Sequence, residues 1–324
     1  MRVLLALTVT LSLIPTASAA EIVEKGTFQV RPADNQKEVP ARFRLDERPF
    51  AYEMDLKTTM PAIGVKVYRL RYPSPVKTST PENNTVHAEY YVPQGKGPFP
   101  GVIVLDITGG NQALSRHIST YLASNGIAGL FVQMAYYGPR RPAGSKLRLM
   151  SPNLPHTVAA VTQTVLDLRV ATAWLASRPE LDPNRLGITG TSLGSFLSAL
   201  TGSMEPRLGR VCVLLGGGGF IDGYASHPLA KPWIRMFELM GVSREAMKKV
   251  IEPIDPLTYA SNLKNRKLLI LAARQDEIVP PSMAQMLWEA SGRQAIHWYD
   301  AGHYTAAFHL ADALHHILEH FQAP

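Results

Sequence analysis

The residues best suited to chemistry in this chain are those of the segment G-T-S-L-G at 190–194, which follows the apolar run 185–189. Two glycines around a serine permit a sharp turn between a strand and a helix. In such a turn the serine takes a strained backbone conformation and its hydroxyl projects clear of the sheet. Ser192 is therefore a candidate nucleophile. The alternative is a glycine-rich turn that only closes a buried strand.

A serine hydroxyl needs a base to take its proton, and the base needs a carboxylate to orient it. Asp276 follows an apolar run typical of a buried parallel strand, and His303 lies in a loop before the last helical stretch. We expect His303 to activate Ser192 and Asp276 to orient His303. The position at a strand end favours Asp276 over the two other candidate carboxylates, Asp300 and Asp255.

The chain order of these three residues is the one expected for α/β-hydrolases. From about residue 65 to the C-terminus the sequence resembles that superfamily, in particular its dienelactone-hydrolase and acetyl-esterase-like members. The resemblance lies in the nucleophile turn at 186–194, the acid loop at 274–281 and the histidine loop at 301–303. It implies a serine hydrolase with Ser192, Asp276 and His303 as its catalytic triad.

An oxyanion hole needs two backbone N–H donors. Leu193 supplies the first, and the loop after the strand 101–105 supplies the second, from Thr108 or alternatively Gly109.

The same loop departs from the family pattern, because Asp106 and Ile107 stand where a His-Gly pair is usual. A carboxylate disfavours a nearby anion unless it points away or pairs with a cation. The candidate cations are Arg116, Arg140 and Arg141.

The segment 135–142 follows the carboxyl end of a predicted strand, where ligands bind in open α/β sheets. Tyr137 offers an apolar wall with a polar tip, and Arg140 and Arg141 offer guanidinium groups for a substrate anion. Substrate contact by these three residues is one expectation. The alternative is a structural arginine network that fastens the loop to Asp106 or another acid.

Alternating apolar runs and helical stretches predict an α/β fold, a doubly wound and mostly parallel sheet with helices on both faces. A small helical cap is expected as an insertion at about 220–262. Its apolar residues either line a pocket for an acyl or aromatic group or pack on the core. The expected strands are 65–72, 86–92, 101–105, 127–132, 185–189, 211–215, 268–273 and 295–299. The expected helices are 115–124, 158–176, 193–203, 282–291 and 305–321.

The 324 residues are enough for one large catalytic domain, which we place at 62–324. Residues 1–19 are predicted to be a signal peptide, because an apolar stretch too short to span a bilayer ends in small residues. Export to the periplasm or the extracellular space follows from this. An N-terminal strand or membrane anchor is the alternative. Residues 20–61 lack sustained periodicity and are predicted to be an extension that wraps the domain or a partly ordered arm.

The formal net charge of +7 comes from scattered residues, which argues against a nucleic-acid partner. Stable membrane insertion, a cofactor and a metal are not expected. His309, His316 and His320 have helical spacing, but they lie opposite the apolar stripe and are predicted to form a solvated face.

The expected function is hydrolysis of small-molecule carboxylic esters by an exported enzyme, through an acyl-Ser192 intermediate. A serine peptidase of the same fold and a catalytically silent binding protein are the alternatives. No motif specifies the acyl group, the alcohol group or an oligomeric state.

Overall fold

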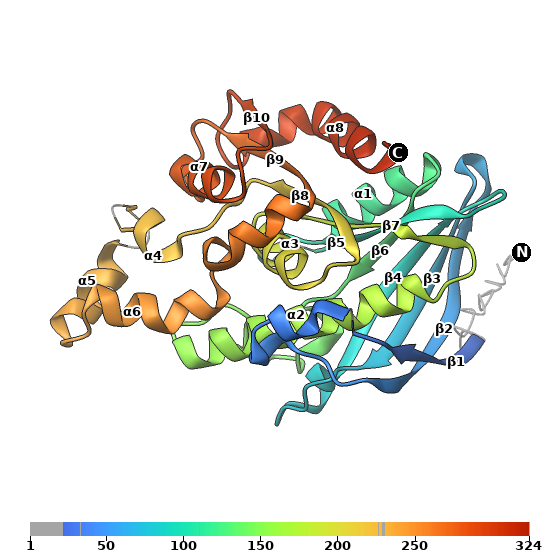
Figure 1. The fold of residues 1–324 in the computed structure, drawn as a ribbon, viewed down its shortest axis with the longest axis horizontal. Helices are drawn as coiled ribbons and strands as arrows, with labels where there is room; N and C mark the ends of the chain where they lie inside the picture. Colours follow the sequence, from blue (N-terminus) through green and yellow to red (C-terminus); the bar gives the residue numbers. More distant parts are fainter. Residues whose placement is uncertain (1–21, 33, 110, 226, 229–230, 324) are drawn as a thin grey trace, which may run out of the picture.

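One twisted sheet forms the centre of the molecule in the computed structural model, which describes residues 22–32, 34–109, 111–225, 227–228 and 231–323 (Figure 1). Its strand order is β1-β2-β3-β4-β6-β5-β7-β8-β9-β10. The antiparallel strands are β1 (Ile22–Val30), β2 (Arg48–Met60), β3 (Val65–Pro73) and β4 (Thr85–Pro93). The parallel strands are β5 (Phe99–Leu105), β6 (Ala128–Val132), β7 (Leu181–Thr191), β8 (Leu208–Leu214), β9 (Lys267–Ala273) and β10 (Ala295–Tyr299).

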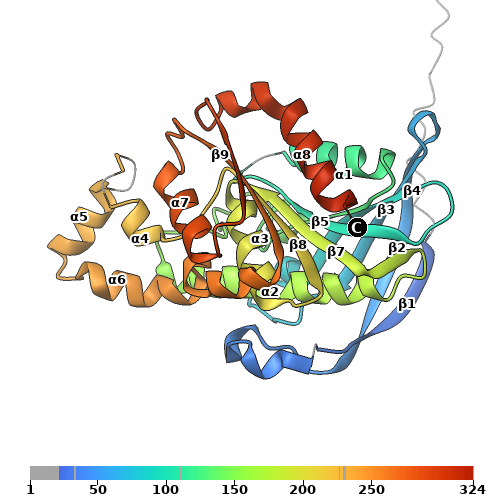
Figure 2. The same ribbon diagram turned by 45° about the horizontal axis from the view of Figure 1, so that its top comes forward.

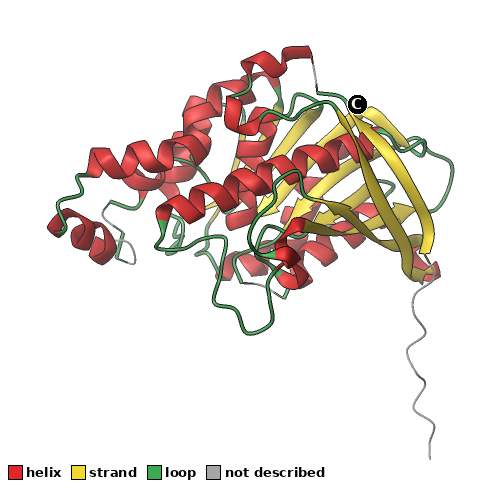
Figure 3. Cartoon of the chain, turned by 90° about the horizontal axis from the view of Figure 1, so that it is seen from below, coloured by secondary structure: helices red, strands yellow, loops and turns green. Residues whose placement is uncertain are grey.

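Helices cover both faces of the parallel strands, and the side chains of β5 show this alternation. Val102 and Val104 pack in one apolar cluster with α1 (Ala113–Ser124) and α8 (Leu310–Gln322). Ile103 and Leu105 pack in the other with α2 (Leu154–Ala176), α3 (Leu193–Met204) and α7 (Pro281–Ala290). Because both faces are covered, the central strands β5, β6 and β9 are nearly continuous apolar runs. The predicted doubly wound α/β fold is confirmed, and Figure 3 shows the strands in yellow with helices around them.

The chain between β8 and β9 forms the predicted cap. It contains α4 (Phe220–Gly223), α5 (Lys231–Leu239) and α6 (Arg244–Ile251), followed by the 3₁₀ helices Glu252–Ile254 and Pro256–Asn265. Figures 1 and 2 show α5 and α6 projecting from the end of the molecule opposite β1–β3.

The N-terminal segment is part of the sheet and not a separate arm. Strands β1 and β2 pair antiparallel and extend the sheet beyond β3. Side-chain contacts tie this edge to α2 and the turn after it: Tyr52 packs edge-on against Trp174, and Glu24 is 2.8 Å from Arg178. The pairing could not be seen in the sequence because half of the β2 side chains are exposed, without regular alternation. Residues 1–19, the predicted signal peptide, lie outside the described residues.

Within the described ranges no helix is long and apolar enough to cross a membrane.

Candidate active site

Ser192 lies at the junction of β7 and α3, in the strained conformation that its flanking glycines predict. Its φ is +52°, in a backbone region that residues other than glycine rarely adopt. A Cβ on Gly190 would collide with the carbonyl oxygen of Gly194, and one on Gly194 would lie 2.6 Å from the carbonyl oxygen of Asp106. The two glycines are therefore needed for the close approach of the turn to itself and to the neighbouring loop.

His303 lies between Ser192 and Asp276. Its Nε2 is 3.1 Å from the Ser192 Oγ, and its Nδ1 is 2.8 Å from the Asp276 Oδ2. The Asp276 carboxylate is buried and accepts backbone N–H bonds from Ile278 (2.9 Å) and Val279 (2.7 Å). A carboxylate held in this way keeps the proton of His303 on Nδ1 and leaves Nε2 free to accept the serine proton.

The two other candidate carboxylates have different partners. Asp300 accepts a hydrogen bond from the Gln275 side chain at 2.6 Å. Asp255 accepts backbone bonds from Gly219 and Phe220, each at 2.7 Å, so that it holds the start of the cap. The structure thus brings Asp276, and neither of these two, to the His303 ring.

Glu277 fixes the loop that carries His303, a role that the sequence analysis did not identify. Its Oε2 accepts the His303 backbone N–H at 2.8 Å, and this bond lowers the pKa of the Glu277 carboxyl. A Cβ on Gly302 would collide with the same carboxylate. Asp276 therefore orients the His303 ring, and the adjacent Glu277 holds the His303 backbone.

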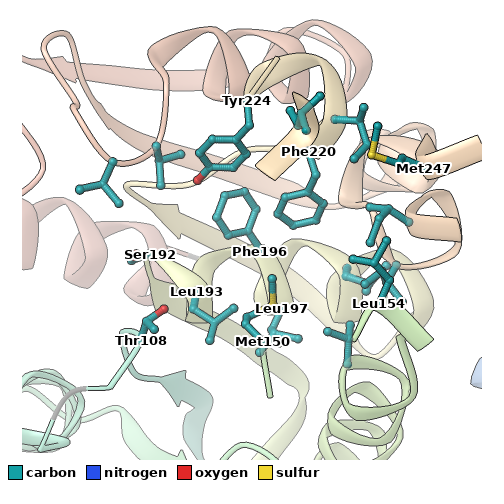
Figure 4. Close-up of a pocket in the computed structure, with 18 of the residues that line it drawn as sticks. Thr108, Met150, Leu154, Ser192, Leu193, Phe196, Leu197, Phe220, Tyr224 and Met247 are labelled. Carbon is teal, nitrogen blue, oxygen red and sulfur yellow. The ribbon is translucent and has the colours of Figure 1, made fainter. Parts of the chain in front are cut away.

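The loop after β5 approaches Ser192 through Thr108, as Figure 4 shows. Asp106 is buried and uses its Oδ1 to accept the Ile107 N–H at 2.9 Å, so it holds its own loop. Burial raises the pKa of this carboxyl. Arg116 lies close enough to act on Asp106 through space, but its direct ion pair is with Glu89, at 2.8 Å.

The prediction that Arg140 contacts substrate is wrong. Arg140 is 0% exposed, and its guanidinium donates to the Asp167 carboxylate at 2.7 Å and to the carbonyls of Gln133 and Asn83, each at 2.9 Å. The guanidinium lies in the interior because Asp167 of α2 is buried with it. The structural alternative therefore holds for Arg140, with Asp167 in place of Asp106.

Tyr137 and Arg141 are likewise absent from the described residues that line the two cavities at Ser192. Tyr137 is buried, and its hydroxyl interacts with the Thr108 side chain and the Gly109 backbone. Tyr137 therefore supports the loop that approaches Ser192. The prediction that it contacts substrate is wrong.

Two apolar cavities meet at Ser192 and Thr108, which line both. The first, of about 420 Å³, extends under the cap, and no charged side chain is among its described lining residues. Figure 4 shows Phe196 of α3 and Phe220 and Tyr224 of the cap around it. The second, of about 480 Å³, lies on the side of His303. Both volumes are in the range of sites for small organic molecules.

Comparison with known proteins places this site in a family. The model of the prolyl oligopeptidase family matches residues 160–322, and that of alpha/beta hydrolase domain containing 18 matches residues 33–230. The chain belongs to the α/β-hydrolase superfamily, which both models represent.

Solved structures share the fold at low sequence identity. An acetyl xylan esterase from Paenibacillus sp. R4 has a TM-score of 0.67 and 22% identity, over 88% of this chain and 92% of that one. Acetyl xylan esterase 1 from Thermoanaerobacterium sp. has a TM-score of 0.65 and 19% identity, over 83% and 88%.

An uncharacterized protein of Mycobacterium tuberculosis, Rv2627c, is 28% identical over 159 residues, 45% of this chain. The chain covers only about a third (34%) of that relative's length.

Proposed function

We propose that this protein is a serine carboxylesterase with Ser192 as nucleophile, His303 as general base and acid, and Asp276 as the group that orients His303. One observation carries the proposal: a continuous path of hydrogen-bonding distances from Ser192 to His303 to Asp276, with the serine hydroxyl between two apolar cavities. Ester hydrolysis needs this activated nucleophile and space for two organic groups.

In the proposed reaction, His303 Nε2 takes the Ser192 proton as Oγ attacks the ester carbonyl carbon. The backbone N–H groups of Leu193, the first residue of α3, and of Thr108 would stabilise the oxyanion. His303 then returns the proton to the alcohol oxygen as the ester bond breaks, which leaves an acyl-Ser192. Water activated by the same ring hydrolyses this intermediate.

The position of His303 indicates which part of the ester each cavity would hold. Because His303 must protonate the leaving alcohol, the alcohol would occupy the cavity that His303 lines. The acyl group would then occupy the cavity under the cap. Since no charged group is among the described residues of that cavity, esters with neutral apolar acyl groups are the substrate class that fits it.

A serine peptidase is the second candidate, favoured by the match of residues 160–322 to the prolyl oligopeptidase family. A peptide presents several backbone polar groups, which would lose their hydrogen bonds to water against apolar walls. The lining of the cavity under the cap therefore favours an ester over a peptide.

Export remains part of the proposal and is supported by the signal-like pattern of residues 1–19. N-terminal sequencing of the protein recovered from the periplasm or medium tests it. Processing near residue 19 is expected, and an unprocessed protein that stays with the cytoplasmic fraction would contradict it.

The enzymatic proposal is tested by measuring hydrolysis of p-nitrophenyl esters and chromogenic peptide amides by wild type, Ser192→Ala, His303→Ala and the double variant. We expect ester hydrolysis to fall by about three to six orders of magnitude in each single variant and little further in the double variant, because the two residues act as a unit. Faster cleavage of the peptide amides, or strictly additive losses, would contradict the proposal.

A further inference from the structure

Three side chains with metal-binding atoms converge on the surface between β10 and α8. His297 lies on β10, and Asp312 and His316 lie one turn apart on α8. One ligand atom from each is within 4.8 Å of the other two. From its helical spacing His316 was predicted to lie on a solvated face. In the structure it meets Asp312 of its own helix and His297 of β10.

The other two histidines of that predicted face differ from His316. His320 points inward instead of toward solvent, and burial lowers its pKa to about 4. His309 stacks on the Tyr299 ring at 5.0 Å. The three histidines therefore have separate environments, and only His316 faces both a second imidazole and a carboxylate.

The spacing of the donor atoms suits a small divalent transition metal. Asp312 Oδ2 is 3.4 Å from His316 Nε2 and 3.9 Å from His297 Nε2. Ligand atoms on tetrahedral zinc lie about 3.3 Å apart, from metal–ligand distances of about 2.0–2.1 Å. All three ligand atoms lie within 4.8 Å of one another, so the side chains would have to draw together on binding. Two imidazoles and one carboxylate favour Zn²⁺ over Mg²⁺ or Ca²⁺, which prefer oxygen ligands.

Tyr299 holds the carboxylate of Asp312 through a hydrogen bond. Its buried hydroxyl donates to Asp312 Oδ2 at 2.9 Å, an outer hydrogen bond of the kind that orients carboxylate ligands in metal sites. The side chains of His297, Asp312 and His316 are 44%, 54% and 30% exposed, so an ion from solvent can reach them. We propose that His297, Asp312 and His316 form a zinc-binding site with a fourth position open to water.

The site has a structural consequence for the chain around His303. Strand β10 ends at Tyr299 and α8 begins at Leu310, so the ligands flank the segment 300–309 on both sides. A metal bridging His297 to α8 would cross-link the two elements that hold this segment. We therefore expect zinc to reduce local opening of 300–309 as well as to raise the Tm.

The test uses the full chain without a polyhistidine tag, treated with a chelator, and titrated with Zn²⁺ by calorimetry and with Co²⁺ by visible absorption. We expect one Zn²⁺ per chain and a Tm rise of about 3–6 °C at a hundredfold excess over Kd. His297→Ala and His316→Ala should each weaken binding at least about tenfold. His315→Ala is the matched control, since this neighbouring histidine pairs with Glu319 at 3.2 Å and should leave Kd unchanged.

Hydrogen exchange gives an independent measurement. Amides of 300–309 should exchange more slowly with Zn²⁺ in the wild type and at an unchanged rate in His316→Ala, whose Tm without metal verifies that it is folded. The proposal is overturned if the wild type does not bind Zn²⁺, if His297→Ala and His316→Ala bind as well as wild type, or if His315→Ala loses binding equally. Slower exchange in His316→Ala as well would overturn the assigned cross-link. None of these results depends on esterase activity.

Discussion

Lengthening the acyl group of an ester probes the cavity of about 420 Å³ between Ser192 and the cap. Each methylene buried from water contributes about 0.8 kcal/mol, or about a fourfold increase in kcat/KM if the contact persists in the transition state. Four added methylenes, from acetate to hexanoate, should therefore raise kcat/KM up to about two-hundredfold at constant alcohol. Spectrophotometry of p-nitrophenyl acetate, butyrate and hexanoate measures the gain.

Ile221→Trp tests whether this cavity produces the gain. Ile221 lies on α4 and lines the cavity, so the larger ring should occupy the space of the longer acyl chain. The hexanoate advantage should shrink to about tenfold or less, while acetate is hydrolysed at nearly the wild-type rate. Ile63→Trp, at an exposed position outside the lining residues, is the matched control and should behave as wild type.

The reasoning about the cavity is refuted if wild-type kcat/KM falls from acetate to hexanoate. It is also refuted if Ile221→Trp lowers the rates on all acyl lengths equally. A wild type inactive on every ester would instead contradict the proposed enzymatic function itself.

Three further outcomes are expected. Asp276→Asn should lower kcat about 10³- to 10⁴-fold because the His303 tautomer is lost, whereas Asp300→Asn should change it less than about twofold; steady-state kinetics decides. Arg140→Ala should lower the free energy of unfolding by about 3–5 kcal/mol in urea titrations, because it leaves a buried carboxylate unpaired, without any selective effect on anionic esters. Burial lowers the pKa of His320 from 6.5 to about 4. Between these pH values His320 is protonated in the unfolded chain but not in the folded one, so the free energy of unfolding falls as the pH drops from 6.5 to 4. The loss should approach about 3 kcal/mol at pH 4 and be smaller in His320→Gln, as measured by urea unfolding at pH 7 and pH 4.

The parts of the molecule that the sequence predicted are those with local causes. The turn around Ser192 needs its small neighbours within a few residues, so G-x-S-x-G is visible in the chain. Buried parallel strands contain continuous apolar runs, so the predicted positions of β5 to β10 match within a few residues, as do those of the antiparallel strands β3 and β4.

The parts that could not be predicted depend on pairs distant in sequence. Arg140 is buried because Asp167, 27 residues later, is buried opposite it. Strands β1 and β2 were missed because a half-exposed edge leaves no regular period. His297 meets His316 only when β10 and α8 pack side by side. Residue types at these positions were visible in the sequence, but their orientation is a tertiary property.

The central claim is that Ser192 is an activated nucleophile, and reaction with a fluorophosphonate probe tests it most directly. The measurement is the mass and site of the adduct on the folded protein, found by peptide mass spectrometry. We expect one adduct per chain, on Ser192, absent in Ser192→Ala and formed at least about a hundredfold more slowly in His303→Ala. A folded wild type that forms no adduct, or forms it at another residue, would contradict the account.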